Sequence, residues 1–281
     1  IDVSLVGSEM CIRDSFSDEA ARVFQKKPDL LRYSSTFAEA LLQVSQNPKS
    51  AAVVPIENSV AGTVAQVQDA LVSLDLVILG EVSLPITYSL LASADPKEIK
   101  NCYTHSQAFE QTSRWSAENL PQVSPQFTRS NIDSGLQFLD KVEQGDESVA
   151  AIVPVSFAMK HPQYLFAENI QDFKNNTTRF LLVKSRGELQ DYDFTREKTA
   201  LFVEFQEDRP GLLYKMLSVF NLFGINLCRL ESRPSKTTPW MYVFYVDFYN
   251  IPESQACLDV LKTSMFNYHI LGSYDVYSPE N

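Results

Sequence analysis

The polar segment at residues 175–180 holds the side chains of this chain that are best suited to bind an acidic molecule. It reads Asn-Asn-Thr-Thr-Arg-Phe and stands directly before residues 180–183, a short apolar run typical of a buried strand. In α/β proteins, ligand-binding groups gather at the mouths of such strands. Arg179 offers a fork of donors that fits a carboxylate, although a solvated arginine in a polar loop would give the same pattern.

Two further polar clusters each stand between a strand-like run and a helix-like run. In the cluster at residues 55–63, Asn58 and Ser59 either cap a helix or help to hold an anion at its N-terminus. The cluster at residues 104–107 has Gln111 one helical turn further on. His105 has the chemistry of a general base, but a single histidine is more often structural, and no Ser-His-Asp grouping is evident from the spacing.

The elements that position these clusters alternate between strand and helix as far as residue 183. We expect strands at residues 51–54, 76–79, 86–91, 149–153 and 180–183, and helices that start near residue 38 and span residues 60–74, 106–118 and 133–144. This alternation predicts an α/β fold with a mostly parallel, covered sheet.

A charged stretch at residues 184–197 lacks an apolar period, so we place a linker there, at residues 185–196. A smaller unit follows. Its predicted strands are residues 199–205, 225–230, 241–248 and 270–277, and its predicted helices start near Pro210 and Gln255. The order βαββαβ is that of a ferredoxin-like unit.

The composition is that of an ordinary globular protein. The 281 residues are 44% hydrophobic and 21% charged, with a net charge of −11 and no basic run, which argues against a nucleic-acid partner. Four scattered cysteines give no zinc spacing, and no dinucleotide or phosphate-loop motif occurs, so we expect no metal and no organic cofactor. No apolar run reaches membrane-spanning length and no signal peptide is evident, so we expect a cytoplasmic protein without a membrane partner.

Taken together, the motifs closely resemble the prephenate dehydratase family. The resemblance rests on residues 54–59 with Gly62, residues 104–107 and residues 176–180, in that order. The smaller unit resembles the amino-acid-sensing ACT module of that family. Its signatures are Pro-Gly-Leu-Leu at residues 210–213 and Glu-Ser-Arg-Pro at residues 231–234. The resemblance covers about residues 15 to 280.

The resemblance implies a fold and an activity. It implies a two-lobed catalytic domain similar to periplasmic binding proteins at residues 1–184, with its second lobe at about 82–160, and a ferredoxin-like ACT domain at 197–281. It implies a carbon–oxygen lyase that converts prephenate to phenylpyruvate, with loss of carbon dioxide and water, in L-phenylalanine biosynthesis. It further implies feedback regulation by L-phenylalanine and a homodimer or homotetramer.

By motif position, the resemblance makes Thr178 the catalytic hydroxyl, which would help the ring hydroxyl of prephenate to leave as water. Asn58, Gln111 and Thr104 are the other expected catalytic residues of the cleft. Arg179 is expected to hold a substrate carboxylate. The other expected substrate-binding residues are Phe180, Asn176, Glu57, Ser59 and Ser15. The expected effector-binding residues are Pro210, Gly211, Leu212 and Leu213 and, near a partner subunit, Glu231, Ser232, Arg233 and Pro234.

The sequence departs from the family pattern before Ser15. The family has Gly-Pro-x-Gly-(Ser/Thr)-(Phe/Tyr)-Ser after its first strand, whereas residues 7–14 here read Gly-Ser-Glu-Met-Cys-Ile-Arg-Asp. Ser15 keeps the hydroxyl of the motif. Our hypothesis is that the residues before about 15 are a non-native replacement or a sequence-assembly artefact. If the stretch is genuine, it would impair one wall of the cleft. The family also usually has serine at Thr104 and proline at Ser106.

Two alternatives stay open. Arogenate dehydratase performs the same chemistry on an aminated substrate, and the motifs do not separate the two activities. A non-catalytic amino-acid-binding or regulatory protein is the alternative of another class, against which Thr178 next to Arg179 and the lack of a secretion signal argue. No chorismate mutase helical segment precedes the first domain, so we expect a monofunctional enzyme.

Overall fold

The computed structural model describes residues 2–6, 15–27, 30–187, 192–205, 207, 209–263 and 266–279. The hypothesis about the residues before Ser15 therefore falls mostly outside the described residues, as do residues 188–191 of the predicted linker. The domain limits drawn from the sequence stay predictions.

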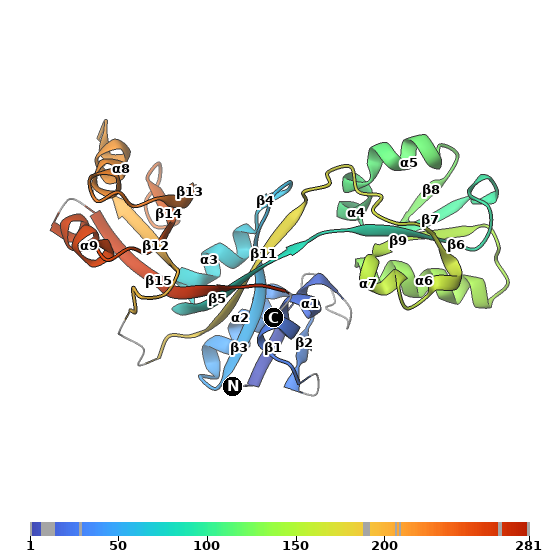
Figure 1. Ribbon diagram of the computed structural model, residues 1–281, viewed down its shortest axis with the longest axis horizontal. Helices are drawn as coiled ribbons and strands as arrows, with labels where there is room; N and C mark the ends of the chain where they lie inside the picture. The colour runs from blue at the N-terminus through green and yellow to red at the C-terminus, as the bar shows by residue number, and fades with distance from the viewer. Residues whose placement is uncertain are drawn as a thin grey trace.

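The described strands form two mixed sheets, which lie at the two ends of an elongated molecule (Figure 1). The large sheet has the order β13-β14-β12-β15-β5-β11-β3-β1-β2, with β4 beside β3. Its strands are β1 (Asp2–Val6), β2 (Arg32–Ser34), β3 (Ser50–Asn58), β4 (Gly62–Thr63), β5 (Leu76–Pro85), β11 (Thr177–Ser185), β12 (Lys198–Phe205), β13 (Leu227–Pro234), β14 (Tyr242–Tyr249) and β15 (Phe266–Tyr277). Its helices are α1 (Phe16–Phe24), α2 (Phe37–Gln46), α3 (Ala65–Ser73), α8 (Leu212–Leu222) and α9 (Ser254–Thr263).

The small sheet has the order β10-β6-β9-β7-β8 and forms a second lobe. Its strands are β6 (Tyr88–Ala92), β7 (Asn101–Thr104), β8 (Ser124–Phe127), β9 (Val149–Pro154) and β10 (Leu165–Ala167). Its helices are α4 (Ser106–Gln111), α5 (Ser113–Asn119), α6 (Asn131–Glu143) and α7 (Val155–Ala158), with 3-10 turns at Pro96–Glu98 and Pro162–Tyr164. Two crossings join the lobes, from β5 to β6 and back to β11 (Figure 1).

The α/β class and the two-lobed architecture are confirmed, but the expectation of a mostly parallel sheet is wrong in part. β1 runs parallel to β2 and β3, and β7 runs parallel to β8 and β9. β11 is antiparallel to both β3 and β5, because the chain re-enters the first lobe from the opposite direction after it has built the second.

Two helix predictions fail at polar residues. The helix expected at residues 60–74 begins only at Ala65, because Gly62 and Thr63 turn back to pair with β3. The helix expected at 106–118 breaks at Thr112. There the carboxylate of Asp172 accepts hydrogen bonds from the backbone amides of Arg114 and Trp115, at 3.0 and 3.1 Å, and so starts a second helix.

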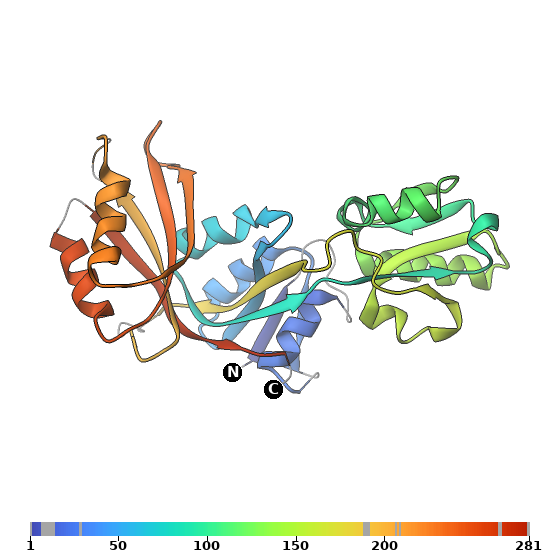
Figure 2. The ribbon, with the colours of Figure 1, turned by 45° about the horizontal axis from the view of Figure 1, so that its top comes forward.

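The predicted βαββαβ unit is present as β12-α8-β13-β14-α9-β15. Its helices lie on the face of its strands that points away from the first lobe (Figure 2). The end of β15 continues into the first lobe, where residues 275–277 pair in parallel with residues 80–82 of β5. Close contact requires Gly272, since a Cβ at that position would lie 2.3 Å from the backbone oxygen of Ile78.

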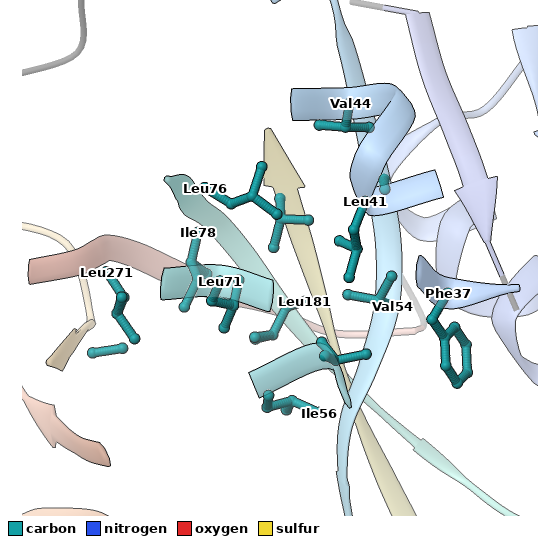
Figure 3. Close-up of a cluster of buried hydrophobic side chains, with 14 of the residues drawn as sticks. Phe37, Leu41, Val44, Val54, Ile56, Leu71, Leu76, Ile78, Leu181 and Leu271 are labelled. Atoms are coloured by element: carbon teal, nitrogen blue, oxygen red, sulfur yellow. The ribbon is translucent and has the colours of Figure 1, made fainter. Parts of the chain in front are cut away.

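A hydrophobic core extends across this junction. Helices α2 and α3 cover β3, β5 and β11 through side chains such as Leu41, Leu71 and Leu181, and Leu271 of β15 joins the same cluster (Figure 3). Phe202 and Tyr245 of the C-terminal unit also belong to it. Full burial of a side chain such as leucine contributes about 1.5–3 kcal/mol, so the two units stabilise each other.

Candidate active site

A cavity of about 310 Å³ lies between the two lobes. The first lobe supplies side chains from α1, β3 and β11, and the second supplies side chains from β6, α4 and the start of α6. The lining combines apolar residues such as Phe16, Tyr88 and Phe180 with polar ones such as Asn58 and Thr178. A mixed lining of this size is typical of a site for a small, partly polar molecule.

Thr178 and Asn58 are directly opposite each other on the neighbouring strands β11 and β3. The amide Nδ2 of Asn58 donates to the hydroxyl Oγ1 of Thr178 at 2.8 Å and to Oδ1 of Asn176 at 2.7 Å. The same side chain accepts from two backbone amides through Oδ1, which fixes the orientation of its amide group. Because the Thr178 oxygen already accepts a hydrogen bond, its own proton can be donated to a molecule in the cavity.

Gln111 connects this pair to the second lobe. Its Oε1 accepts from Nδ2 of Asn176 at 2.8 Å, so a continuous chain of amides runs from α4 to Asn58 and on to Thr178. The side chains of this chain are buried. The structure thus brings together three of the four predicted catalytic residues, the outer two of which, Asn58 and Thr178, are 120 positions apart in the sequence.

The fourth, Thr104, does not line the cavity. It is completely buried, and its hydroxyl donates to the carbonyl oxygen of His105 at 3.2 Å. His105 does line the cavity, and its Nδ1 accepts from the backbone amide of Gln107 at 3.4 Å, which makes it the N-cap of α4. Both residues therefore have local structural roles.

Some of the predicted substrate-binding residues also line or adjoin the cavity, and others lie away from it. Ser15 and Phe180 line the cavity, and Asn176 lies behind it in the amide chain. Ser59 is exposed, and its hydroxyl ties two backbone groups of residues 175 and 177 together. Glu57 points to the other face of the sheet, since successive strand residues alternate between faces.

Arg179 is also on the far face, which corrects the expectation that it holds a substrate carboxylate. Its guanidinium pairs with Glu57 at 3.0 Å, Glu81 at 2.7 Å and Asp247 at 2.9 Å. Burial disfavours the charged guanidinium, but Asp247 and Glu81 outweigh this effect and raise the pKa of Arg179. Three protein carboxylates already pair with its two terminal Nη groups, on the face of the sheet away from the cavity.

Sequence reasoning missed Arg129, the arginine that lines the cavity within the described part of the chain. Its guanidinium has no ion-pair partner among the described residues. It directly precedes Ser130, whose hydroxyl caps α6 by accepting from the amide of Asp133 at 3.1 Å. A polar segment between a strand and a helix was the signal used for the clusters at residues 55–63 and 104–107, and residues 128–131, between β8 and α6, fit the same description.

A second cavity, of about 380 Å³, lies in the C-terminal unit. Of the eight predicted effector residues, Gly211, Leu212, Leu213 and Ser232 line it. The other four, Pro210, Glu231, Arg233 and Pro234, do not line it. The carboxylate of Glu231 accepts hydrogen bonds from Arg229 and Thr63, and Arg233 approaches Asp69 at 3.6 Å. Pro210 directly precedes Gly211 in the sequence, and Pro234 is the last residue of β13. Gly211 starts α8 with a φ of +85°, which favours glycine.

Within the described residues, no cluster of His, Cys, Asp and Glu side chains is arranged to hold a metal ion. In the same part of the chain, every helix is too short or too polar to cross a membrane.

The family model described as "PDT: Prephenate dehydratase" matches residues 11–188. A prephenate dehydratase of Methanocaldococcus jannaschii is 32% identical over 94% of this chain and 96% of its own length. A bifunctional chorismate mutase/prephenate dehydratase of Aquifex aeolicus is 34% identical over 85% of this chain, and this chain spans only 65% of that relative.

Solved structures agree with this match. The prephenate dehydratase of Staphylococcus aureus Mu50 superposes with a TM-score of 0.80 and 28% identity, over 98% of this chain and all of that one. Prephenate dehydratase from Arthrobacter aurescens, solved in complex with L-Phe, gives 0.78 and 30% over 98% and 90% of the two chains.

Proposed function

This chain belongs to the prephenate dehydratase family, and from that premise we propose that it converts prephenate to phenylpyruvate, as a carbon–oxygen lyase of L-phenylalanine biosynthesis. The observation that carries the proposal is the hydroxyl of Thr178, held in the cavity between the lobes by the amide of Asn58.

The chemistry asks for a positioned proton donor. Prephenate loses a ring hydroxyl and a carboxylate, and its ring becomes aromatic, so much of the driving force lies in the substrate. The Thr178 hydroxyl accepts from Asn58 and can donate its own proton toward the departing hydroxyl. A threonine hydroxyl is a weak acid, so hydrogen-bond donation and preorganisation, rather than ionisation of Thr178, lower the barrier.

The walls of the cavity suit a dianion with a six-membered ring. Arg129 and the first amides of α6 provide positive potential for a carboxylate in a chain whose net charge is −11. Phe16 and Tyr88 form an edge-to-face pair with ring centroids 5.8 Å apart and offer an apolar wall for the ring. Burial raises the pKa of Tyr88 well above its ordinary value, so this wall stays neutral.

We propose that the second cavity binds L-phenylalanine as a feedback effector. The related protein of Arthrobacter aurescens was solved in complex with L-Phe. In this chain, the cavity of the C-terminal unit has apolar walls and is also lined by Arg209 and Glu207, which contact each other at 2.7 Å. Feedback requires that phenylalanine favour a less active state by about 1–3 kcal/mol. A homodimer or homotetramer would place a partner near residues 231–234, as the family resemblance implies.

Phenylpyruvate release from prephenate by the purified chain, with and without phenylalanine, tests both parts. Activity with prephenate that exceeds the activity with arogenate in kcat/KM supports the proposal. A larger kcat/KM with arogenate would assign the arogenate activity instead, and binding without turnover of either compound would favour the non-catalytic alternative.

A further inference from the structure

A buried cluster of charges lies behind the cavity, on the opposite face of β3 and β11. We call it the junction cluster and define it by six side chains: Glu57, Glu81, Arg179, Lys198, Arg229 and Asp247. Arg179 is at its centre, paired with carboxylates from β3, β5 and β14. Lys198 of β12 adds a contact of 2.8 Å to Glu81. The cluster therefore joins the first lobe to the C-terminal unit.

The cavity and the junction cluster share backbone. Thr178 and Asn58 face the cavity, while Arg179 and Glu57, their direct neighbours in sequence, pair with each other in the cluster. Arg179 is opposite Glu57 and Phe180 is opposite Pro55, so β3 has one extra residue at Ile56, as in a β-bulge of β3. A bulge aims side chains in directions that a regular strand would not allow, so its local geometry needs to be held.

We propose that Arg179 is a positioning residue: its bond to Asp247 of the C-terminal unit holds the segment of β11 that pairs with the bulge of β3, and thereby Thr178, in the geometry that dehydration needs. The proposal rests on the proposed function for its catalytic part. It assigns Arg179 no contact with substrate.

The ion pairs of Arg179 with Glu81 and Asp247 are strong because they are buried. The Glu81 and Asp247 side chains are 2% and 6% exposed, so removal of the guanidinium would leave two buried carboxylates facing each other. Burial alone would raise the pKa of Glu81, but Arg179 and Lys198 lower it overall. Lys198 belongs to β12 and Asp247 to β14, so their ion pairs with Glu81 and Arg179 form only when these two strands pack against the first lobe.

The same strand connects the cluster to the second cavity. Tyr242 and Phe244 of β14 line the proposed effector cavity, and Asp247 follows three residues later. A shift of β14 that accompanies effector binding would act directly on the bond from Asp247 to Arg179. This contiguity is spatial, so coupling between the two sites has to be measured.

The test compares Asp247→Asn and Arg179→Lys with a matched control, Lys236→Met. Lys236 also joins the two units, through a 2.8 Å contact with Asp69, but its side chain is 73% exposed and neither residue of this contact belongs to the junction cluster. We expect Asp247→Asn to lower kcat with prephenate about 3- to 30-fold, and Arg179→Lys by at least as much, with KM within about twofold of the wild-type value. The control should keep both constants.

Two kinetic outcomes would overturn the proposal. A KM that rises in Arg179→Lys while kcat is unchanged would make Arg179 a substrate ligand. Unchanged kcat in folded Asp247→Asn would show that the bond across the junction does not position Thr178. Asp247→Asn is nearly isosteric, so it still tests the positioning role of Arg179 if Arg179→Lys fails to fold.

Hydrogen–deuterium exchange separates this inference from the proposed function. Without substrate, the peptide that contains residues 176–180 should exchange faster in Asp247→Asn than in the wild type, and not in Lys236→Met. Equal exchange in the wild type and Asp247→Asn would refute the positioning role even if the enzyme turns over prephenate. Absence of turnover in the wild type would refute the proposed function, and the exchange comparison would still decide the positioning role.

Discussion

Asn58 donates a hydrogen bond of 2.8 Å to Thr178 across two antiparallel strands, and this direction of donation determines what the threonine can do. An oxygen that accepts from an amide keeps its own proton for another acceptor. The two positions are 120 apart in the sequence, and the segment between them includes the whole second lobe, so the pair forms only after the chain has passed through that lobe and returned. The pair is therefore a sensitive point at which to test the proposed chemistry.

Thr178→Val should lower kcat about 10²- to 10⁴-fold, the usual effect of losing a positioned proton donor, with little change in KM. The volume of the side chain is conserved, so the fold should persist. The matched control is Thr177→Val, the same change one residue earlier, where the side chain does not line the cavity. Steady-state phenylpyruvate formation measures both, and near wild-type turnover in folded Thr178→Val would remove this residue from the mechanism.

Arg129→Met should raise KM for prephenate about tenfold or more and change kcat much less, because a lost carboxylate contact weakens binding of ground state and transition state alike. Arg114→Met, on α5 outside the cavity lining, is the control for the change in net charge. A selective loss of kcat in Arg129→Met would instead indicate that the guanidinium acts mainly in the transition state.

Stability should fall with acidification through the titration of Glu81. Its pKa in the folded protein lies below the ordinary value of 4.5, because Arg179 and Lys198 outweigh burial. The stabilisation is thus fully present above about pH 4.5 and is lost as the pH falls through the lower, folded-state pKa. Urea unfolding between pH 6 and pH 3, a range chosen around the ordinary glutamate value, should show a shallower loss of stability for Glu81→Gln than for the wild type. The same change at exposed Glu118 is the control, and equal slopes in all three proteins would contradict the prediction.

The sequence allowed prediction of the α/β class and the βαββαβ unit, because local apolar periods and turn residues carry that information. The meeting of Thr178, Asn58 and Gln111 was expected only from the resemblance of their motifs to the family. That resemblance misplaced Arg179, since a motif indicates proximity to a site but not the face of the strand on which each residue lies. The direction of β11 and the pairing of residues 275–277 with β5 depend on how the two lobes and the C-terminal unit meet. Such long-range contacts leave little trace in local patterns. Residues 128–131 did carry a readable signal.

Removal of residues 196–281 is expected to abolish activity as well as the response to phenylalanine, although a simple two-module arrangement would spare catalysis. The truncation would strip β15 from β5, expose the core around Leu271 and leave Arg179 without Asp247. Thermal unfolding and phenylpyruvate release should both show the loss. If the truncated chain retains activity and also remains sensitive to phenylalanine, the effector does not act through the C-terminal unit.

Ser232→Leu should raise the phenylalanine concentration for half-maximal response about tenfold or more, because the larger side chain fills part of the second cavity.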